Sequence, residues 1–429
     1  MPISRDRESV YGDLQVFNGW KGGITNLKRP SDIDQTNELL DAVNVDLSDS
    51  GKIRVRQGLT EEKSGEFSNL FSYKNVLYGL SNTNFVSFDN LFNETIILSN
   101  INKYKKMYYL EVNDELYFSN GEQSGKINKY GSYDIWSVES PLDKPAYLVE
   151  AGGLLPKGTY IIAYSYLYGT YETGISPIEV VKVNNDNSKI TINTSANSIS
   201  TGAIIYAQQG EVLYQIGSGY SVVFENTIQV SGKTVKSENS KSFPMCENLA
   251  YYKARIYGSF DSYLTFTDIF DYRQFNPTMN FVEIDGTKIL SILPYASGLF
   301  IITENSIWKL EGDSYAFNKV LLENVKTIKG TEFKHERKQV NGILTTEGVI
   351  LFAFDGKYQN VSETKIDFSK YESGSALFKM QDGIQSVIFS LVGKDLGSTY
   401  RDNNYENGKI ISYWFYIFNF VKYKNNKEI

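Results

Sequence analysis

The chain has 429 residues, of which 41% are hydrophobic and 22% charged, and its formal net charge is -7. This composition excludes a disordered chain, and the length indicates about two domains. The 43 basic residues form no long run and are outnumbered by 50 acidic ones, which argues against a sequence-reading nucleic-acid binder.

The single cysteine, Cys246, has no partner within the chain, so neither an intrachain disulfide nor a cysteine-based zinc site can form. This favours folding in a reducing cytoplasm. The polar start Met1–Arg7 is followed by no apolar core, so we expect no signal peptide. The longest aromatic run, Tyr413–Phe418, is too short to cross a bilayer, so we expect no membrane span.

The N-terminal part contains one helix candidate and one basic strand. Ser31–Ala42 is the helix candidate, because Ser31 can cap it and an apolar pair lies inside it. Further along, charged and apolar residues alternate, so Lys52, Arg54 and Arg56 share one face of a predicted strand. That face is either a solvated surface or a contact to an acidic partner subunit.

A short apolar hairpin core recurs along the chain. The cores begin at positions 75, 114, 254, 298, 348 and 385, so the steps between them are 39, 140, 44, 50 and 37 residues. Four of these steps match one propeller blade of roughly 40 to 50 residues. The 32 Tyr and 25 Phe favour pleated, half-buried surfaces. The pattern predicts an all-β fold, a β-propeller of about six blades, with 44–56 or 410–421 as the strand that closes the ring.

The long step of 140 residues predicts an insertion at 143–243, because it equals one blade plus about 100 residues, the size of one sandwich domain. Alternation in Gly158–Tyr168 places tyrosines on one face of a strand, and several short strands follow. The segment resembles a fibronectin type III or immunoglobulin-like β-sandwich. We therefore expect an N-terminal arm and the first blades at 1–142, the sandwich at 143–243, and the remaining blades with a C-terminal strand at 244–429.

Two later segments are also predicted to be strands. Ser297–Glu311 indicates a hairpin in which one strand is buried on both faces, since 299–302 is continuously apolar. The aromatic segment Tyr413–Phe420 is either a core strand or an aromatic anchor at an interface.

The sequence predicts no catalytic, cofactor-binding or metal-binding residue, and hence no enzyme. The only histidine, His335, lies in a charged stretch and cannot build a multi-histidine metal site. A histidine-based triad needs a nucleophile and an acid within reach. The glycines at positions 12, 19, 22 and 23 lack the Gly-Lys-Ser/Thr ending of a phosphate-binding loop.

Two stretches of the chain carry a family resemblance. Residues 41–58 resemble the opening of the propeller-containing tail hub and nozzle proteins of short-tailed bacteriophages, where a strand, an Asp/Gly turn and a basic strand ending in glycine precede the first blade. The matching residues are Asn44, Val45, Asp46, Asp49, Gly51, Arg54, Arg56 and Gly58. Residues 247–260, with 264–268 and 275–277, are similar to the blade that follows the inserted domain of that family.

The resemblance implies a structural virion protein. Proteins of that family form a ring, usually six-fold, below the portal and its adaptor. The ring extends the channel, helps to retain the genome and pass it during ejection, and anchors distal tail parts. We therefore expect a homo-oligomer in the virion tail, assembled in the host cytoplasm. Its partners would be portal, adaptor and other tail proteins, with DNA passing the lumen without sequence-specific binding.

An alternative function remains open, that of a carbohydrate-binding or glycan-cleaving propeller. Two suitably placed carboxylates hydrolyse glycosidic bonds, and the chain has 50 Asp and Glu. Against this alternative, the sequence has no sialidase-type Asp-box repeat and no arginine cluster. Oligomeric state separates the two functions, because a glycan hydrolase need not form a ring.

Overall fold

The computed structural model describes residues 63–226, 233–235, 239–335, 340–361, 368–381 and 384–393, and the strand residues 23–24, 38–39, 45–47 and 53–55. All regular secondary structure in these residues is β-strand, so the all-β prediction is confirmed. None of the described residues belongs to a helix long and apolar enough to cross a bilayer.

The helix predicted at 31–42 is wrong where the structure describes it. Glu38–Leu39 forms a short strand, β2, which pairs in parallel with Gly23–Ile24, β1. The two adjacent leucines of this segment do not repeat at helical spacing, so a helix here would have no apolar stripe to bury. The other residues of the predicted helix lie outside the described part of the chain.

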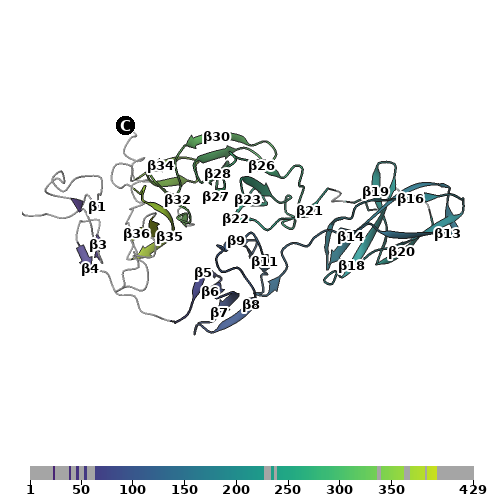
Figure 1. Cartoon of the computed structure of the whole chain (residues 1–429), viewed down its shortest axis with the longest axis horizontal. Helices are drawn as coiled ribbons and strands as arrows, with labels where there is room; N and C mark the ends of the chain where they lie inside the picture. Colours follow the sequence, from purple (N-terminus) through teal and green to yellow (C-terminus); the bar gives the residue numbers. More distant parts are fainter. Residues whose placement is uncertain are drawn as a thin grey trace, which may run out of the picture.

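The chain forms a β-propeller of five four-stranded antiparallel sheets and one two-stranded sheet, which follow one another in chain order around an axis (Figure 1). The first three sheets contain β5 (Phe67–Tyr73), β6 (Val76–Ser81), β7 (Asn84–Phe88) and β8 (Glu94–Leu98); β9 (Tyr108–Val112), β10 (Glu115–Ser119), β11 (Ser124–Ile127) and β12 (Tyr133–Asp134); and β22 (Glu247–Tyr252), β23 (Arg255–Phe260), β24 (Tyr263–Phe266) and β26 (Phe281–Glu283). The last three contain β27 (Ile289–Tyr295), β28 (Gly298–Thr303), β29 (Ile307–Glu311) and β30 (Asn318–Glu323); β31 (Phe333–His335), β32 (Val340–Thr345), β33 (Gly348–Ala353) and β34 (Tyr358–Asn360); and β35 (Tyr371–Gln381) and β36 (Ile384–Gly393).

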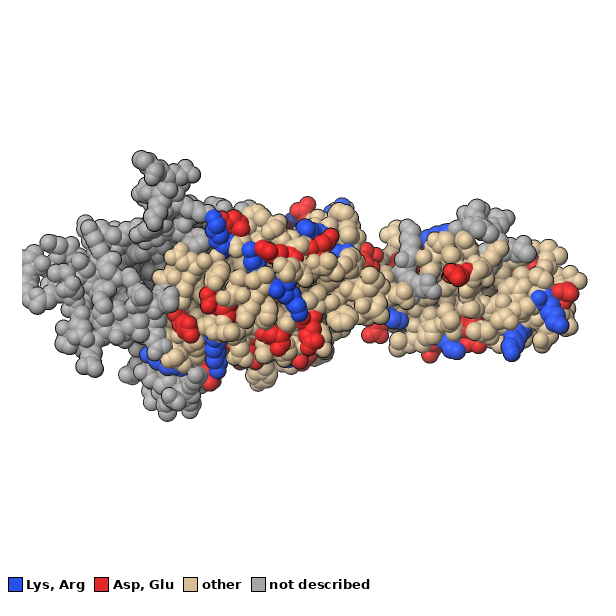
Figure 2. Space-filling view, turned by 90° about the horizontal axis from the view of Figure 1, so that it is seen from above, with Lys and Arg blue, Asp and Glu red and all other residues tan. Residues whose placement is uncertain are grey.

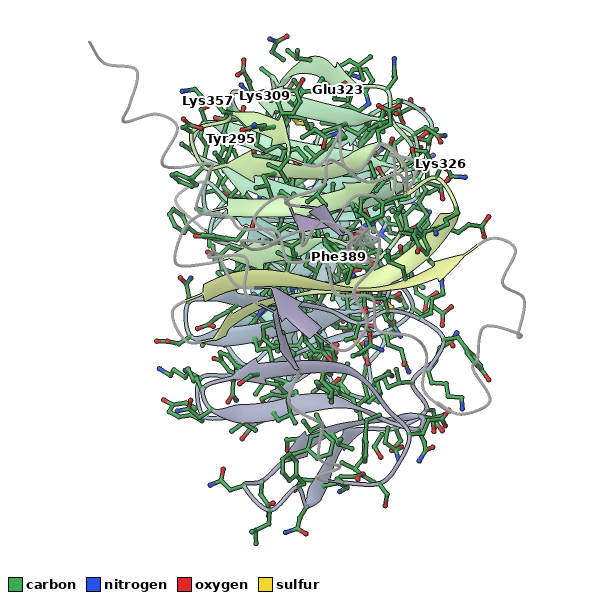
Figure 3. All side chains as sticks on the ribbon, turned by 90° about the vertical axis from the view of Figure 1, so that its left-hand side faces the viewer. Tyr295, Lys309, Glu323, Lys326, Lys357 and Phe389 are labelled. Carbon is green, nitrogen blue, oxygen red and sulfur yellow. The ribbon has the colours of Figure 1, made fainter. Side chains whose placement is uncertain are left out.

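The up-and-down order of the strands gives the propeller two faces. We call the side with the turns between the first and second strand of each sheet the hairpin face. The opposite side, which carries the connections from one sheet to the next, is the entry face. Seen from the side, Tyr295 and Lys357 lie toward the hairpin face and Lys326 toward the entry face (Figure 3).

Tight turns on the hairpin face set the strand register of three sheets. Lys74-Asn75, Asn113-Asp114 and Lys253-Ala254 each have two consecutive residues with positive φ, between 44° and 63°. Two such residues between paired strands form a type I′ turn, whose twist matches that of the strands. The turn therefore fixes which residues of each hairpin face the neighbouring sheets.

Aromatic and aliphatic side chains between neighbouring sheets form the propeller core. Phe85 of the first sheet lies 4.5 Å from Phe118 of the second, measured between ring centroids. The Phe300 and Phe352 rings join the fourth and fifth sheets at 4.8 Å, and Phe333 meets Phe389 of the sixth at 5.9 Å. A blade is thus buried on both faces only because its neighbours stack on it.

The predicted repeat coincides with these sheets. The cores at 75, 114, 254, 298 and 385 fall on β6, β10, β23, β28 and β36, the second strands of their sheets. The core at 348 is instead the third strand of the fifth sheet, β33, and the second strand, β32, begins at Val340. Both strands are apolar, so composition alone does not separate them, and this explains the uneven steps of 50 and 37 residues.

The predicted ring closure is not seen in the described residues. Val45–Leu47 (β3) and Ile53–Val55 (β4), inside the candidate 44–56, pair with each other as a two-stranded sheet. One edge of each strand is therefore already hydrogen-bonded to the other strand. The second candidate, 410–421, and the aromatic segment Tyr413–Phe420 lie outside the described residues.

The inserted β-sandwich extends away from the propeller as an arm (Figure 1). One of its sheets contains β13 (Ala146–Leu155), β17 (Ser188–Asn193) and β20 (Ser221–Phe224), and the other contains β14 (Gly158–Tyr168), β15 (Tyr171–Ile175), β16 (Glu179–Val183), β18 (Gly202–Gln209) and β19 (Val212–Ser218). As the alternation predicted, Tyr164 and Tyr166 point into the core between the two sheets. The strands of the arm all fall inside the predicted segment 143–243.

Candidate functional site

Charged side chains gather where the innermost strands begin, on the entry face near the propeller axis. We call Lys105, Lys106, Glu247, Lys288 and Glu332 the axial cluster. The two lysines at 105 and 106 precede β9, Glu247 opens β22, and the other two residues directly precede β27 and β31. The innermost strands all run in the same direction, so these residues meet at one end of the axis.

Glu247 is the centre of one half of this cluster. Its carboxylate lies 2.8 Å from the Lys288 ammonium and 3.9 Å from that of Lys105. Lys105 also approaches Glu122, at 3.7 Å, so two carboxylates share one lysine. Gly121 makes this possible: a Cβ atom there would lie 3.2 Å from Cγ of Glu247, and φ is +82°. Glycine lets the β10–β11 turn rest against the glutamate.

The other half of the cluster links two distant sheets. Lys106, between the first and second sheets, forms an ion pair with Glu332, which precedes the fifth. The Glu332 side chain is only 13% exposed, and its Oε2 atom has no hydrogen-bond partner among the described residues. Second and fifth positions face each other in a ring of six sheets, so this pair lies across the axis.

A separate polar network fastens the connection between the third and fourth sheets. The Asp285 carboxylate accepts hydrogen bonds from Ser306, from Trp308 Nε1 at 3.1 Å and from the Thr287 hydroxyl at 2.6 Å. Burial alone would raise the pKa of this carboxyl, but the donated hydrogen bonds, that of Ser306 first, lower it to about 2. Asp285 is therefore ionised at neutral pH and holds the loop to β29.

The junction of arm and propeller is a third polar site, at the narrow waist visible in Figure 2. Gln274 of the propeller donates a hydrogen bond of 2.7 Å to the Glu172 carbonyl of the arm. The Arg273 guanidinium lies 4.6 Å from the centre of the Tyr171 ring. Gly174 packs on the returning chain, where a Cβ atom would come 1.9 Å from the Ser240 carbonyl oxygen. These contacts give the arm a defined orientation.

The arrangement of charges is that of cross-links between loops. The carboxylates of Glu122, Glu247 and Glu332 each have a lysine partner within 4 Å. The described residues contain no group of three His, Cys, Asp or Glu that could hold a metal ion. On the face of the molecule drawn in Figure 2, basic and acidic residues are interspersed.

None of the candidate residues considered in the sequence belongs to the axial cluster, although Cys246 directly precedes Glu247. His335 ends β31, and its side chain is not among those described. Arg54 lies in β4, again without a described side chain, and 52 and 56 fall outside the described residues. The axial cluster itself was missed by sequence reasoning, because its members are ordinary Lys and Glu residues, and Lys106 and Glu332, for example, lie 226 positions apart.

Comparison with known proteins yields no functional assignment. No family model and no curated protein matches the chain. Among solved structures, Hsv2 of Kluyveromyces lactis is 10% identical, with a TM-score of 0.27, over 76% of this chain and 88% of that one. AztD of Citrobacter koseri is 10% identical, with a TM-score of 0.25, over 68% and 84%. Identities and scores of this size transfer no activity.

Proposed function

We propose that this chain is a structural subunit of a closed ring in the tail of a short-tailed bacteriophage, a hub or nozzle that extends the portal-adaptor channel. The observation that carries the proposal is a pair of unlike apolar surfaces. Phe260, Tyr263 and Phe281 are exposed on the propeller, and Ile178 and Val180 are exposed on the arm. Sizeable exposed apolar patches mark interaction sites. Two unlike patches on one chain suit a head-to-tail contact, which closes into a ring when its rotation permits.

The resemblance of 41–58 to the opening of tail hub and nozzle proteins supports the same function. Within this stretch β3 and the basic strand β4 pair antiparallel, which is compatible with such an opening. Portal, adaptor and more distal tail proteins would then be the partners, and the particle would be assembled in the host cytoplasm.

In this proposal DNA passes between the subunits and not through a single propeller. The Lys106–Glu332 pair crosses the axis of the individual propeller. A lumen enclosed by several copies has no such obstruction. The net charge of -7 is compatible with transit of DNA, because tight phosphate binding requires many Lys and Arg contacts.

One observation favours a second candidate, a carbohydrate-binding propeller. Tyr263 and Phe281 are exposed, and their ring centroids are 6.1 Å apart. Two acidic residues lie beside them: Asp261 is in the β23–β24 turn, and Glu283 pairs with Tyr263. Aromatic rings with a few polar groups beside them are a common lining of ligand sites. This second candidate function is binding and requires no catalytic residue.

Inactivation of the gene in its parent phage tests the proposal. Particles lacking this chain should have filled heads that leak DNA or that lack distal tail parts. Particles that are complete, retain DNA and only fail to attach to cells would contradict the ring and favour the carbohydrate-binding alternative. A matched phage with the Leu91→Ser substitution, at an exposed position away from both apolar surfaces, serves as the control.

A further inference from the structure

The aromatic surface of the propeller is exposed because the second sheet is too short to cover it. Phe260 and Tyr263 are paired across the β23–β24 hairpin, and Phe281 pairs with Thr265 two residues further along. Paired and alternate residues share a face of the sheet, so all three aromatic rings lie on one side. Ile256, on the same side of β23, packs against the second sheet. We call Phe260, Tyr263 and Phe281 the aromatic patch.

The outer strands of the second sheet stop before they reach this patch. β12 has only two residues and pairs with Lys126 and Ile127, at the hairpin-face end of β11. Beyond it the chain leaves for the arm. Among the described strands, none therefore covers the outer part of the third sheet on the entry-face side, and Phe260 is 62% exposed.

Acidic side chains accompany the aromatic patch. Asp261 follows Phe260 in the turn, and Glu283 is paired with Tyr263 across the strands. Both residues are exposed, and neither carboxylate forms an ion pair with any described residue. Lys319 approaches Glu283 but donates to its backbone carbonyl, at 2.9 Å. A partner for this surface should combine apolar side chains with a positive charge.

The arm presents that combination on β16 and on Ile178, which directly precedes it. Ile178 and Val180 are exposed, Val180 to 47%, and Lys182 is exposed two residues further along the same face. The described residues give Lys182 no ion pair. We call Ile178, Val180 and Lys182 the edge strip, because β14 is the one described strand that pairs with β16, along one edge of β16. The alternate residues Val181 and Val183 point into the sandwich core.

The edge strip is out of reach of the aromatic patch of its own chain. β16 lies on the part of the arm away from the propeller (Figure 1). The contacts of Arg273 and Gln274 with the arm hold it in that direction. A contact between strip and patch therefore needs two molecules.

We propose that the edge strip of one copy docks on the aromatic patch of the next copy. Two apolar side chains meet three aromatic rings, and the Lys182 ammonium faces Asp261 and Glu283. This is a heterologous contact, in which each copy uses a different surface, and repetition closes a ring. The inference rests on the proposed function and names the surfaces that build the ring.

Cysteine cross-linking of the full chain tests the contact. The only natural cysteine, Cys246, is buried and gives little background. The double variant Val180→Cys/Phe260→Cys should form a ladder of disulfide-linked oligomers that ends at a closed species. The control Val180→Cys/Leu91→Cys, whose second site is 81% exposed on another sheet, should remain uncross-linked. A ladder in the control alone, or in neither variant, overturns the contact.

A charge exchange gives a second readout that does not depend on cysteine chemistry. Lys182→Glu should weaken self-association about tenfold, and Lys182→Glu/Glu283→Lys should restore it, because an opposed charge pair is re-formed. Sedimentation of the wild-type chain shows whether it self-associates at all, and sedimentation of the variants shows whether this contact is responsible. Oligomers that are unaffected by Lys182→Glu and by Phe260→Ser would overturn this contact and leave the ring standing. A monomer that binds glycans through Tyr263 would overturn both.

Discussion

Lys106 and Glu332 are 226 positions apart in the sequence, yet they form an ion pair across the propeller axis. The pair ties the second sheet to the fifth at the end of the axis where the inter-sheet connections lie. No local pattern encodes it. It exists because the sheets close around an axis and bring the first residues of opposite inner strands together.

Loss of the lysine from this pair should destabilise the propeller. Lys106→Ala leaves the largely buried Glu332 carboxylate without its partner, and we expect a loss of about 1 kcal/mol, kept small because the lysine itself is well exposed. Urea unfolding measures this loss in the free energy of unfolding. Lys106→Ala/Glu332→Gln should recover part of the loss, and Lys157→Ala, at an exposed position of the arm outside the edge strip, should have no effect. Equal losses in all three variants would contradict a specific pair.

The Asp285 network predicts a pH-dependent contribution to stability. The folded pKa of about 2 lies below the usual value near 3.9, so the stabilisation is complete above pH 4 to 5 and disappears as the pH falls through 2. Asp285 is exposed, so solvent screening reduces the effect, and Asp285→Asn should cost about 1 kcal/mol at pH 7. Urea unfolding of both proteins from pH 7 to pH 2 should show the difference shrink toward zero. A difference that grows on acidification would refute the network.

The junction between arm and propeller should be sensitive to a single methyl group. Gly174→Ala would place a Cβ atom 1.9 Å from the Ser240 carbonyl oxygen, so the returning chain must move. We expect a cost of about 1 to 3 kcal/mol and a more variable arm direction. Small-angle scattering and thermal unfolding report the two effects. Gly202→Ala is the matched control, since its nearest neighbour, Leu167 Cδ1, is 3.8 Å away.

The inserted sandwich should fold alone. The buried residues of its main core all lie between Leu155 and Phe224, and within the described residues its strands pair with one another. Residues 143–243 expressed by themselves should unfold in one cooperative transition. A product without cooperative unfolding would show that the arm depends on its contacts with the propeller.

Local patterns predicted more of the fold than of its surfaces. The hairpin cores located five second strands correctly because Gly, Asn and Asp turns and apolar runs are local signals. In the fifth sheet the predicted core fell on the third strand, β33, and not on the second, β32, because both strands are apolar. The axial cluster and the aromatic patch were beyond prediction. The first depends on ring geometry, and the second depends on the short β12, which leaves Phe260 uncovered.

A cryo-EM reconstruction of the parent particle would show whether this chain builds a ring in the tail. We expect a closed ring of copies of this chain below the portal, with the arm of each copy on the propeller of the next. The DNA density should run through the lumen between the copies. DNA density along the axis of a single propeller, or a tail axis that contains no ring of this chain, would contradict it.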